Sequence, residues 1–536
     1  MTDSTTSSSR RSGRLPLAVG LCFLAVVLVR NAWMCDDAYI TFRVVDNFVG
    51  GFGLRWNVAE RVQGYTHPLW MLISAGAYAG TREIYYTGIV VSLGLSVLGA
   101  ALLARLARDR GTALLGLATL GLSKPWVDYS VSGLENPLTH ALLAGLLLVY
   151  LDERRSGREA TPRSLFWLAL LGAAVLLNRL DLVFLVAPPL VARVGWPPAP
   201  RHLAALVLGL LPVGAWTAFS LLYYGSPVPN TAYAKLNTGI PADALLRQGA
   251  LYVADLVSRS PLTAAVIIGG IVAGLTDRRM RPFALGLVLH VAYVVRIGGD
   301  FMSGRFFTAP LVVALGLLLW RGLPRSRPGR LVAVVAVLLL GATWPRSPLW
   351  SGVNYGRADP ERPEVQYGVA DERAVYYQQT GLLPALGREG PPPAHRWVAE
   401  GRAARAAGPG VLRRMGSGFF GFFAGPEVHI VDGHALTDPL LARLTANTAR
   451  GFRIGHFRRV SPKGYEESLR TGANLIEDPD LAAYWDVVRL VTRGPLLDRE
   501  RLETVVKLNL GHYDPLLDSW EDRRRKARAE RQRRRR

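Results

Sequence analysis

The chain has 536 residues, of which 50% are hydrophobic, and its 63 Lys and Arg against 41 Asp and Glu give a formal net charge of +22. Apolar stretches recur from Leu15 to Trp344, a composition typical of a protein with many membrane spans, which excludes an ordinary soluble enzyme. The charge could suggest nucleic-acid binding, but many basic residues lie in short runs between apolar stretches, where the positive-inside rule places them, and another group forms the C-terminal basic run. We therefore expect no nucleic-acid partner.

The N-terminal region predicts an uncleaved first span. Residues 1–14 form a polar, basic tail before an apolar run that lacks a small-residue cleavage site, so we expect a cytoplasmic N-terminus. The only cysteines are Cys22 and Cys35. In a helix they would be about 20 Å apart, which is too far for a disulfide.

About eleven apolar segments are predicted to cross the membrane. With the N-terminus inside, nearly every basic cluster falls on the inner side, as the positive-inside rule demands. The apolar piece "HPLWMLISAGAYAG" does not fit this count and is predicted to lie along the outer leaflet. The predicted spans are residues 15–33, 86–106, 110–123, 137–151, 165–179, 181–194, 202–223, 260–276, 282–297, 308–322 and 330–344.

The chain becomes mixed and polar after Trp344, which predicts a second, soluble domain. The expected fold class is an all-α polytopic membrane domain over residues 15–344, with a first external loop at 34–85, followed by a smaller external α/β domain over 345–520. The basic run of residues 521–536 is predicted to be a disordered tail.

Two adjacent carboxylates, Asp36 and Asp37, directly follow the first apolar run. An ionised acid at a membrane boundary is a functional candidate, because its burial there is costly. Aspartate also favours helix starts, but a single residue would suffice for that role. Two acids followed by Tyr39 and Arg43 favour a site, in which a carboxylate could be a general base, an electrostatic stabiliser or a metal ligand.

The other predicted outside loops hold candidates that also have structural explanations. Trp56 and Tyr65 offer aromatic faces to a lipid or a sugar, although the interfacial aromatic belt explains either one more simply. His67 precedes a proline and is more typical of a structural donor than of a catalytic base. Glu135 in "SGLENPL" is a further outside carboxylate, which helix capping also explains.

Cations on outside loops run against the positive-inside bias and indicate an anionic partner. A phosphate at the membrane surface is the natural ligand for Lys235 and Arg305, since arginine contacts phosphate through two hydrogen bonds. Arg179 is spaced to pair with Asp181, and we weigh that ion pair equally with a binding role. The same loops supply three further candidates, Tyr224, Asn230 and Asp300.

One motif is rejected. The segment "GSGFFG", residues 416–421, formally fits a dinucleotide-binding fingerprint. The fingerprint needs an acid about twenty residues further on, and Asp432 comes too early. We interpret the segment as a turn-rich part of the soluble domain.

Several segments in this order resemble a bacterial branch of the GT-C integral-membrane glycosyltransferases. They are "DDAYITFR", "GFGLRWN", "ERVQGYTHPLW", "SGLENPL", "YYGSPVPNTAYAK" and "GGDFMSGRFFTAPL". The branch includes the arabinofuranosyltransferases of mycobacterial cell-wall arabinan. The segments "VDGHALTDPLLARL" and "GFRIGHFRRVSPKGYEESLRTGANLI" are also similar to it, so the resemblance runs from about Asp36 to Ile476.

This resemblance implies a multi-pass enzyme of the bacterial plasma membrane that transfers a sugar from a polyprenyl-phosphate donor on the external face. It also implies that the essential acid lies in the first external loop, at Asp36 or Asp37, where it would orient or deprotonate the acceptor hydroxyl. Lys235 and Arg305, with Arg179, would hold the donor phosphate. The further candidate substrate contacts are Arg43, Trp56, Tyr65, His67, Glu135, Tyr224, Asn230 and Asp300.

The sequence leaves several points open. Arabinofuranose is one candidate sugar, and the acceptor would be an envelope glycan or a lipid-linked acceptor. No cofactor is clearly indicated, although two adjacent acids could contribute ligands to Mg²⁺ or Mn²⁺. The alternative function is a non-catalytic envelope or motility-associated scaffold that binds a glycan. A transporter ranks last, because the charges lie at the outer ends of spans and not near the midplane.

Overall fold

The computed structural model describes residues 15–533 except 156, 158–159, 196, 237, 358–363 and 449–450. The predicted cytoplasmic tail at 1–14 lies outside the described residues. The chain divides into two compact units. Unit 1 comprises Met1–Ala38, His67–Val213 and Pro241–His395, and unit 2 comprises Tyr39–Thr66, Gly214–Ile240 and Arg396–Arg536.

Each predicted apolar segment coincides with a helix, because long apolar runs favour helices, here even around the internal prolines Pro188, Pro189 and Pro212. One of these helices, α11, begins in unit 1 and ends in unit 2. The helices are α2 Leu15–Asn31, α5 Ile84–Leu106, α6 Arg110–Leu122, α8 Asn136–Arg155, α9 Pro162–Asn178, α10 Val183–Val194, α11 Pro200–Tyr224, α14 Pro261–Thr276, α15 Arg281–Arg296, α16 Thr308–Arg321 and α17 Arg327–Gly341.

Few of these helices meet a strict criterion for crossing a membrane. Among the described residues, α5 and α11 are long and apolar enough, and α13 (Ala242–Arg259) with α14 passes as a pair bent by 111°. Helices α2 and α9 are apolar but shorter than the roughly 20 residues that a perpendicular crossing needs. The predicted helix positions are confirmed, whereas the number of about eleven spans stays a prediction.

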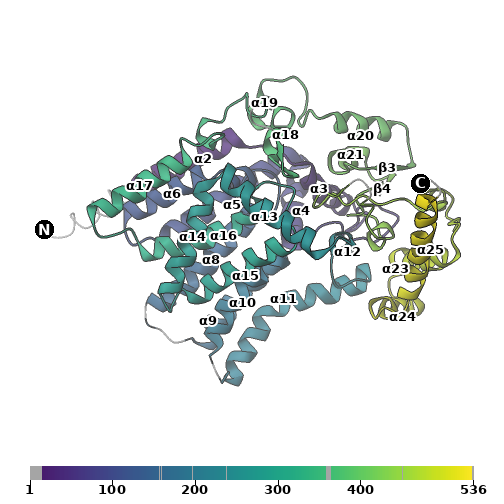
Figure 1. Ribbon diagram of the computed structural model, residues 1–536, viewed down its shortest axis with the longest axis horizontal. Helices are drawn as coiled ribbons and strands as arrows, with labels where there is room; N and C mark the ends of the chain where they lie inside the picture. Colours follow the sequence, from purple (N-terminus) through teal and green to yellow (C-terminus); the bar gives the residue numbers. More distant parts are fainter. Residues whose placement is uncertain are drawn as a thin grey trace. The chain divides into compact units, whose positions relative to one another are not determined.

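Small residues allow the helices of unit 1 to pack closely. Helices α14, α15 and α16 contact one another and lie side by side in Figure 1. Where α5 packs on α8, a Cβ added to Gly99 would lie 3.1 Å from the backbone nitrogen of Ala141. Such close backbone approach at small residues is typical of helix pairs in membranes.

Shorter elements of unit 1 connect these helices. Helix α4 (Pro68–Thr81) occupies the predicted outer-leaflet segment, and its proline suits the first helical position. Helix α3 (Asp36–Val49) begins in unit 1 and continues into unit 2. The remaining elements of this unit include α7 Lys124–Tyr129, β1 Val365–Gln366, β2 Val369–Ala370, α18 Glu372–Thr380 and α19 Leu382–Leu386.

Unit 2 combines short helices with a parallel strand pair. Strands β3 (Gly410–Arg414) and β4 (Val428–Asp432) are joined through α21 (Gly418–Ala424). The unit has a core that includes Val431, Tyr465 and Trp485. Its other helices are α12 Asn230–Leu236, α20 Arg396–Ala406, α22 Tyr465–Thr471, α23 Pro479–Arg493, α24 Arg499–Asn509 and α25 Asp514–Arg533.

The "GSGFFG" segment follows β3 and opens α21, so the strand and helix of the fingerprint are present. The helix has only seven residues. A Cβ added to Gly421 would lie 2.6 Å from the Trp56 indole, so this glycine makes room for a side chain of unit 2.

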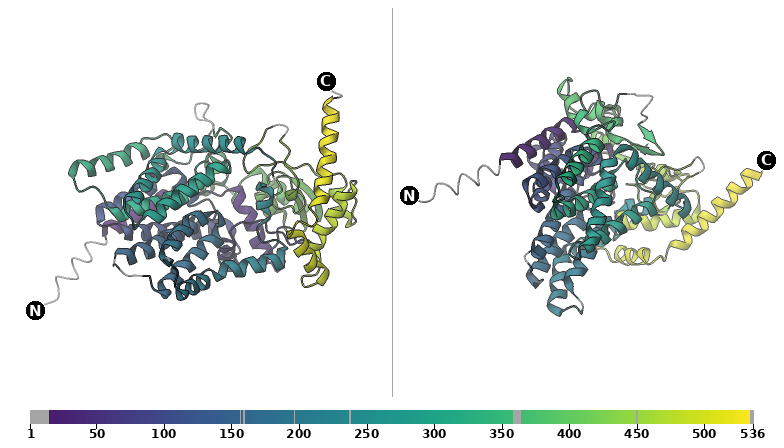
Figure 2. Two further views of the ribbon diagram at one scale, coloured as in Figure 1. Left: turned by 60° about the horizontal axis from the view of Figure 1, so that its bottom comes forward. Right: turned by 60° about the vertical axis from the view of Figure 1, so that its left-hand side comes forward.

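The described part of the predicted disordered tail is helical. Helix α25, yellow in Figure 2, runs as a straight helix to Arg533. The Arg523 guanidinium lies 2.7 Å from Asp478 Oδ1 and 2.7 Å from Asp480 Oδ2, at the start of α23. These ion pairs link the basic segment to the rest of unit 2.

The unit boundary lies further along the chain than the predicted domain boundary at residue 345. Residues up to His395 belong to unit 1, where Gly381 forms a β-bridge with Trp33 and Ala370 forms one with Met302. Backbone pairing of this kind has no sequence signature, because each bridge joins single residues that are far apart in the chain.

Candidate active site

Three predicted outside loops of unit 1 meet at the Glu135 side chain, which is 1% exposed. Arg305 Nη2 donates to both Glu135 carboxylate oxygens, at 3.0 and 3.1 Å. Arg179 Nη1 donates to Oε1 of the same carboxylate at 3.1 Å. Two of the three predicted phosphate-binding cations therefore share one buried carboxylate. We call Glu135, Arg179 and Arg305 the Glu135 cluster.

Local sequence features hold the loops of the cluster in place. Gly299 and Gly304 have φ of +75° and +69°, and a Cβ on Gly299 would collide with the Tyr252 ring. The Tyr252 hydroxyl donates to the Met302 carbonyl at 2.9 Å, which fixes the turn before Arg305. The glycines of "GGDFMSGR" are therefore explained by turn geometry and close packing.

Asn136 and Asn178 tie the ends of the spans to the cluster. The Asn178 side chain donates to the Glu135 carbonyl at 3.1 Å, and the Asn136 side chain donates to Thr308 Oγ1 at 3.0 Å. Arg179 also contacts Asp181 through two hydrogen bonds, at 3.0 and 2.6 Å. The structure contains the Arg179–Asp181 ion pair and places the same arginine in the cluster.

The cluster is charged at neutral pH despite its burial. Burial alone would raise the pKa of Glu135, but Arg305, His67 in its protonated form and Arg179 hold it well below its usual range. Burial disfavours the charged form of Arg305, yet the carboxylates of Glu135, Asp300 and Asp37 raise the pKa of this guanidinium. Burial lowers the pKa of His67 to about 4, so its imidazole is neutral 3.6 Å from Glu135. His67 thus acts as a neutral neighbour of the carboxylate.

Several buried polar atoms of this region lack hydrogen-bond partners among the described residues, including the amide oxygens of Asn136 and Asn178. Arg305 Nε and Asp300 Oδ2 are both buried without such a partner. Asp300 Oδ2 lies 3.8 Å from Arg305 Nη1, which is an ion-pair distance but not a hydrogen bond. Buried polar groups are rarely unsatisfied, so an unused Arg305 donor points to a ligand with acceptor atoms.

Asp36 and Asp37 form the first turn of α3. Asp36 is 6% exposed and Asp37 is half-buried. The effect of Asp37 on the pKa of Arg305 shows that this carboxylate lies within electrostatic reach of the Glu135 cluster. Acidic side chains are also favourable at the start of a helix, so Asp36 and Asp37 can stabilise α3 and take part in chemistry.

Arg43 and Trp56 have packing roles in unit 2. Arg43 donates to the Trp56 and Val428 carbonyls at 2.8 Å each and to the Gly421 carbonyl. Its guanidinium also lies 4.8 Å from the centre of the Trp56 ring. These contacts account for both buried side chains, and a role toward substrate stays a prediction.

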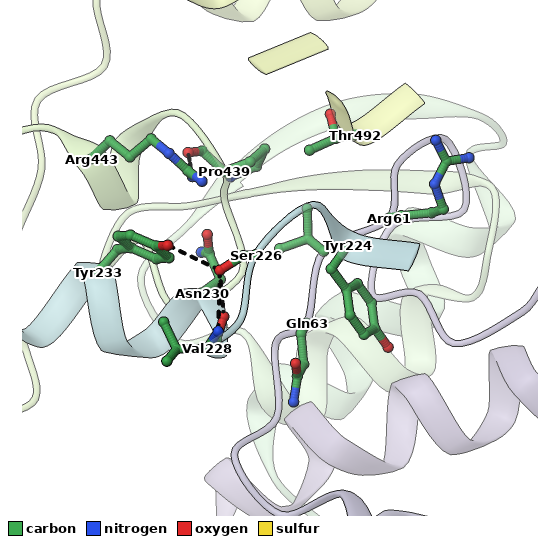
Figure 3. A pocket seen from close by; sticks show the side chains of 11 residues that line it. Arg61, Gln63, Tyr224, Ser226, Val228, Asn230, Tyr233, Pro439, Arg443 and Thr492 are labelled. Atoms are coloured by element: carbon green, nitrogen blue, oxygen red, sulfur yellow. Dashed lines mark hydrogen bonds between the residues drawn. The ribbon is translucent and has the colours of Figure 1, made fainter. Parts of the chain in front are cut away.

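Tyr224 and Asn230 line a pocket of unit 2, shown in Figure 3. Tyr224 exchanges a hydrogen bond of 2.8 Å with the Tyr65 hydroxyl. Asn230 donates to the carbonyls of Ala435, Leu436 and Asp438 at 3.1 Å each, which holds a loop beside the pocket. The lining also includes Arg61, Gln63, Ser226, Tyr233 and Arg443.

Lys235, the third predicted phosphate-binding cation, is exposed on α12 of unit 2. It therefore belongs to a different unit from Arg179 and Arg305. In the described part of the chain, no group of three or more His, Cys, Asp or Glu side chains could hold a metal ion. A divalent metal thus rests on the sequence alone.

Sequence reasoning missed a second buried charge cluster in unit 1. Lys124 and Asp371 are in contact at 3.1 Å, and Arg373 lies 2.6 Å from Asp128. One local signal was available, since Lys124 and Asp128 are four residues apart on a helix and pair with each other. The Asp371 partner is 247 residues from Lys124 and could not be inferred.

Comparisons with known proteins give two sequence relatives. No family model matches the chain. The terminal β-(1→2)-arabinofuranosyltransferase of Mycobacterium tuberculosis is 31% identical over 409 residues, which are 66% of this chain and 63% of that protein. The enzyme of the same name from Corynebacterium glutamicum is 28% identical over 398 residues, 65% of this chain and 56% of that protein. The chain thus spans between 56% and 63% of the length of these relatives.

Among solved structures, ArnT from Cupriavidus metallidurans bound to undecaprenyl phosphate aligns with a TM-score of 0.48 at 14% identity. The alignment covers 79% of this chain and 86% of that one. The sequence relatives confirm the resemblance to glycosyltransferases that the motifs indicated. The particular enzymes to which the chain is similar are terminal β-(1→2)-arabinofuranosyltransferases.

Proposed function

We propose that this protein is a membrane glycosyltransferase of the GT-C type that uses a polyprenyl-phosphate sugar. It would transfer arabinofuranose to an envelope glycan or a lipid-linked acceptor on the external face of the bacterial plasma membrane. The carrying observation is the meeting of Glu135, Arg179 and Arg305 within electrostatic reach of Asp37. The names of the two sequence relatives support the choice of sugar.

Exposed apolar surface supports the membrane part of the proposal. Several helices of unit 1 keep large apolar side chains at the surface, where contact with water would be unfavourable. Such faces suit contact with lipid acyl chains. Examples on α2, α11, α14 and α17 are Val19, Phe23, Val207, Leu211, Ile268, Val272, Leu331 and Val335.

Arg305 is the proposed contact to the donor phosphate. Its Nε has no hydrogen-bond partner among the described residues, while its Nη2 is fixed on Glu135. Glu135 therefore orients the guanidinium, and the buried Nε is the donor that we assign to a phosphate oxygen. A preorganised cation stabilises the charge that develops on the leaving phosphate, and such electrostatic stabilisation commonly contributes most to catalysis. Arg179, which donates to the same Glu135 oxygen, would add to the positive potential.

Asp37 is the proposed base. The acceptor hydroxyl oxygen forms a bond to the anomeric carbon while the bond from that carbon to the phosphate oxygen breaks. The electron pair of the broken bond remains on the polyprenyl phosphate, and the hydroxyl proton passes to the Asp37 carboxylate. A half-buried carboxylate at a helix start can accept this proton because it remains accessible to the acceptor.

The hollow of unit 2 has a volume of about 20 Å³ and is too small to enclose a sugar ring, so we propose it only as a surface contact for the acceptor. It combines an aromatic face, Tyr233, with the hydroxyl of Ser226 and the amide of Gln63, groups that suit a carbohydrate. Arg443 stacks 4.7 Å from the centre of the Tyr233 ring, which holds the ring in place. Figure 3 shows these side chains around one hollow.

The test is a transfer assay with the purified full chain in liposomes. Radiolabelled polyprenyl-phosphoryl arabinofuranose and an arabinan acceptor are the substrates, with polyprenyl-phosphoryl mannose and a nucleotide sugar as comparison donors. We expect label in the glycan from the arabinofuranose lipid and none from the nucleotide sugar. Transfer from the nucleotide sugar would refute the proposal, and so would the absence of transfer from every donor tested.

A further inference from the structure

We propose that residues 369–382, here called the clasp, hold the loops of Asp37 and Arg305 at a fixed position relative to each other. Asp371 is the residue that positions the clasp. The inference rests on the proposed function, because only then do these two loops carry the chemistry. The clasp belongs to unit 1, like both loops, and comprises β2, α18 and the residues that follow α18.

One end of the clasp binds the chain directly before the two acids. Met34 donates its backbone N–H to the Thr380 carbonyl at 3.2 Å, and Leu382 donates to the Ala32 carbonyl at 2.9 Å. Trp33 and Gly381 form the antiparallel bridge between these two bonds. Residues 32–34 therefore have a β-type pairing with the clasp, and Asp36 follows two residues later.

The opposite edge of the same stretch is bound by the loop that leads to Glu135. Trp33 donates to the Val131 carbonyl at 3.1 Å, and Cys35 donates to the Ser132 carbonyl at 3.0 Å. The extended piece before Asp36 thus lies between two partners, the clasp and the Glu135 loop. If the clasp moves, one of the two supports of the acid pair is lost.

The other end of the clasp binds the loop that carries Arg305. Ala370 donates to the Phe301 carbonyl at 2.7 Å and accepts from the Ser303 N–H at 2.8 Å. Both partners lie between Asp300 and Arg305 in the chain. One short segment therefore contacts the supports of the proposed base and of the proposed phosphate-binding cation, and the distance between those supports depends on it.

Asp371 anchors the clasp. It follows Ala370 directly, is 1% exposed, and caps α18 by accepting the Ala374 N–H at 3.2 Å. Three donors converge on its carboxylate: Lys124 Nζ at 3.1 Å, Arg346 Nη1 at 3.0 Å and the Tyr355 hydroxyl at 2.8 Å.

The chemistry of the Asp371 anchor suits a role in fixing the position of the clasp. Burial opposes the charged form of Asp371, yet Lys124 and the surrounding arginines hold its pKa well below the usual range. A buried ionic network is a poor source of net stability, since desolvation offsets the attraction. Its partners must nevertheless meet in one arrangement, because displacement would leave a buried charge unpaired. That requirement fixes where Ala370 and α18 lie.

Cys35 reports the position of the clasp without any enzymatic assay. Cys35 is 1% exposed and directly precedes Asp36 in the chain, whereas the second cysteine, Cys22, is exposed on α2. In a Cys22→Ser background, the rate of maleimide labelling measures how often the stretch between clasp and Glu135 loop opens. The variants are Asp371→Asn, which removes the anchor charge, and Tyr355→Phe, which removes one hydrogen bond from it.

The matched control is Asp478→Asn in unit 2. Asp478 caps α23 and pairs with Arg523 at 2.7 Å, so the change removes a capping aspartate with an arginine partner far from the clasp in sequence. We expect Asp371→Asn to raise Cys35 labelling by roughly 10²-fold and Tyr355→Phe by about fivefold, in proportion to the interactions lost. Asp478→Asn should leave the labelling rate unchanged.

The turnover rate should fall more for Asp371→Asn than for Tyr355→Phe, because misplacement of catalytic groups by about 1 Å can cost about 10²-fold in rate. The thermal unfolding midpoint of Tyr355→Phe should stay near that of the parent, which separates positioning from general destabilisation. If Asp371→Asn does not insert, Tyr355→Phe decides. Unchanged labelling and turnover in the folded variants would overturn the clasp. If the parent protein itself has no transferase activity but Asp371→Asn still raises Cys35 labelling, the clasp is supported and the proposed function is refuted.

Discussion

Replacement of Glu135 by Gln tests whether the buried cluster is built as described. The change keeps the size of the side chain but removes the charge that holds Arg179 and Arg305, at 3.1 and 3.0 Å. Breaking a buried ion pair by removing one partner typically costs about 3–5 kcal/mol, because the remaining charge stays buried and unpaired. With two arginines on one carboxylate, we expect the free energy of unfolding to fall by at least about 3 kcal/mol.

The pH dependence gives this prediction a sign. The pKa of Glu135 in the folded protein lies well below its unfolded value of about 4.3. The stabilising contribution of its carboxylate is therefore complete above that unfolded pKa and is lost as the pH falls through the folded pKa. The difference between parent and Glu135→Gln should be constant between about pH 7 and pH 5, and it should shrink in stronger acid.

The assay is equilibrium unfolding of the detergent-solubilised protein, with Glu503→Gln as control. Glu503 pairs with Arg499 at 2.8 Å on an exposed helix face, where a pair contributes at most about 1 kcal/mol. The control should therefore differ little from the parent. If Glu135→Gln were as stable as Glu503→Gln, the buried ion pairs of the cluster would be an incorrect description of the protein.

Three further outcomes are expected. Arg305→Ala should weaken the binding of a polyprenyl-phosphate sugar and also lower the transfer rate. The binding isotherm of a labelled lipid checks this, and a lower rate with unchanged binding would contradict the assignment. Tyr233→Ala should raise KM for the acceptor glycan with donor affinity unchanged, and initial rates at varied acceptor concentration measure it; an effect on the donor alone would count against the pocket. Reporter fusions after Arg279 should be cytoplasmic and those after Tyr355 external, and an external signal at Arg279 would reverse the predicted topology.

The helices could be predicted from the sequence because their signal is local. Apolar runs bounded by Gly, Pro and charged residues located α5 and α11 to within two residues at each end. The close pairing of Arg179 with Asp181 could be proposed for the same reason, as the two residues are only two positions apart on a tight turn.

The rest of the site depends on contacts between distant residues. Arg305 and Glu135 are 170 residues apart. The predicted topology placed both on the outer side of the membrane but did not predict that Arg305 would bind the Glu135 carboxylate. Sequence reasoning valued Arg43 as a substrate contact, whereas its donors reach the carbonyls of Trp56, Gly421 and Val428. A single sequence contains no information about which carbonyls will lie beside a given guanidinium.

The most direct measurement of the central claim is the single-turnover transfer rate of Asp37→Asn beside Asp36→Asn, with donor affinity measured on the same preparations. A positioned acid–base group contributes about 10²- to 10⁴-fold, so Asp37→Asn should lose that factor in rate. Donor affinity should change little, because the phosphate is assigned to Arg305, and Asp36→Asn should be much the milder change. If both variants folded and transferred sugar at the parental rate, the two acids would be helix caps and the proposed mechanism would be wrong.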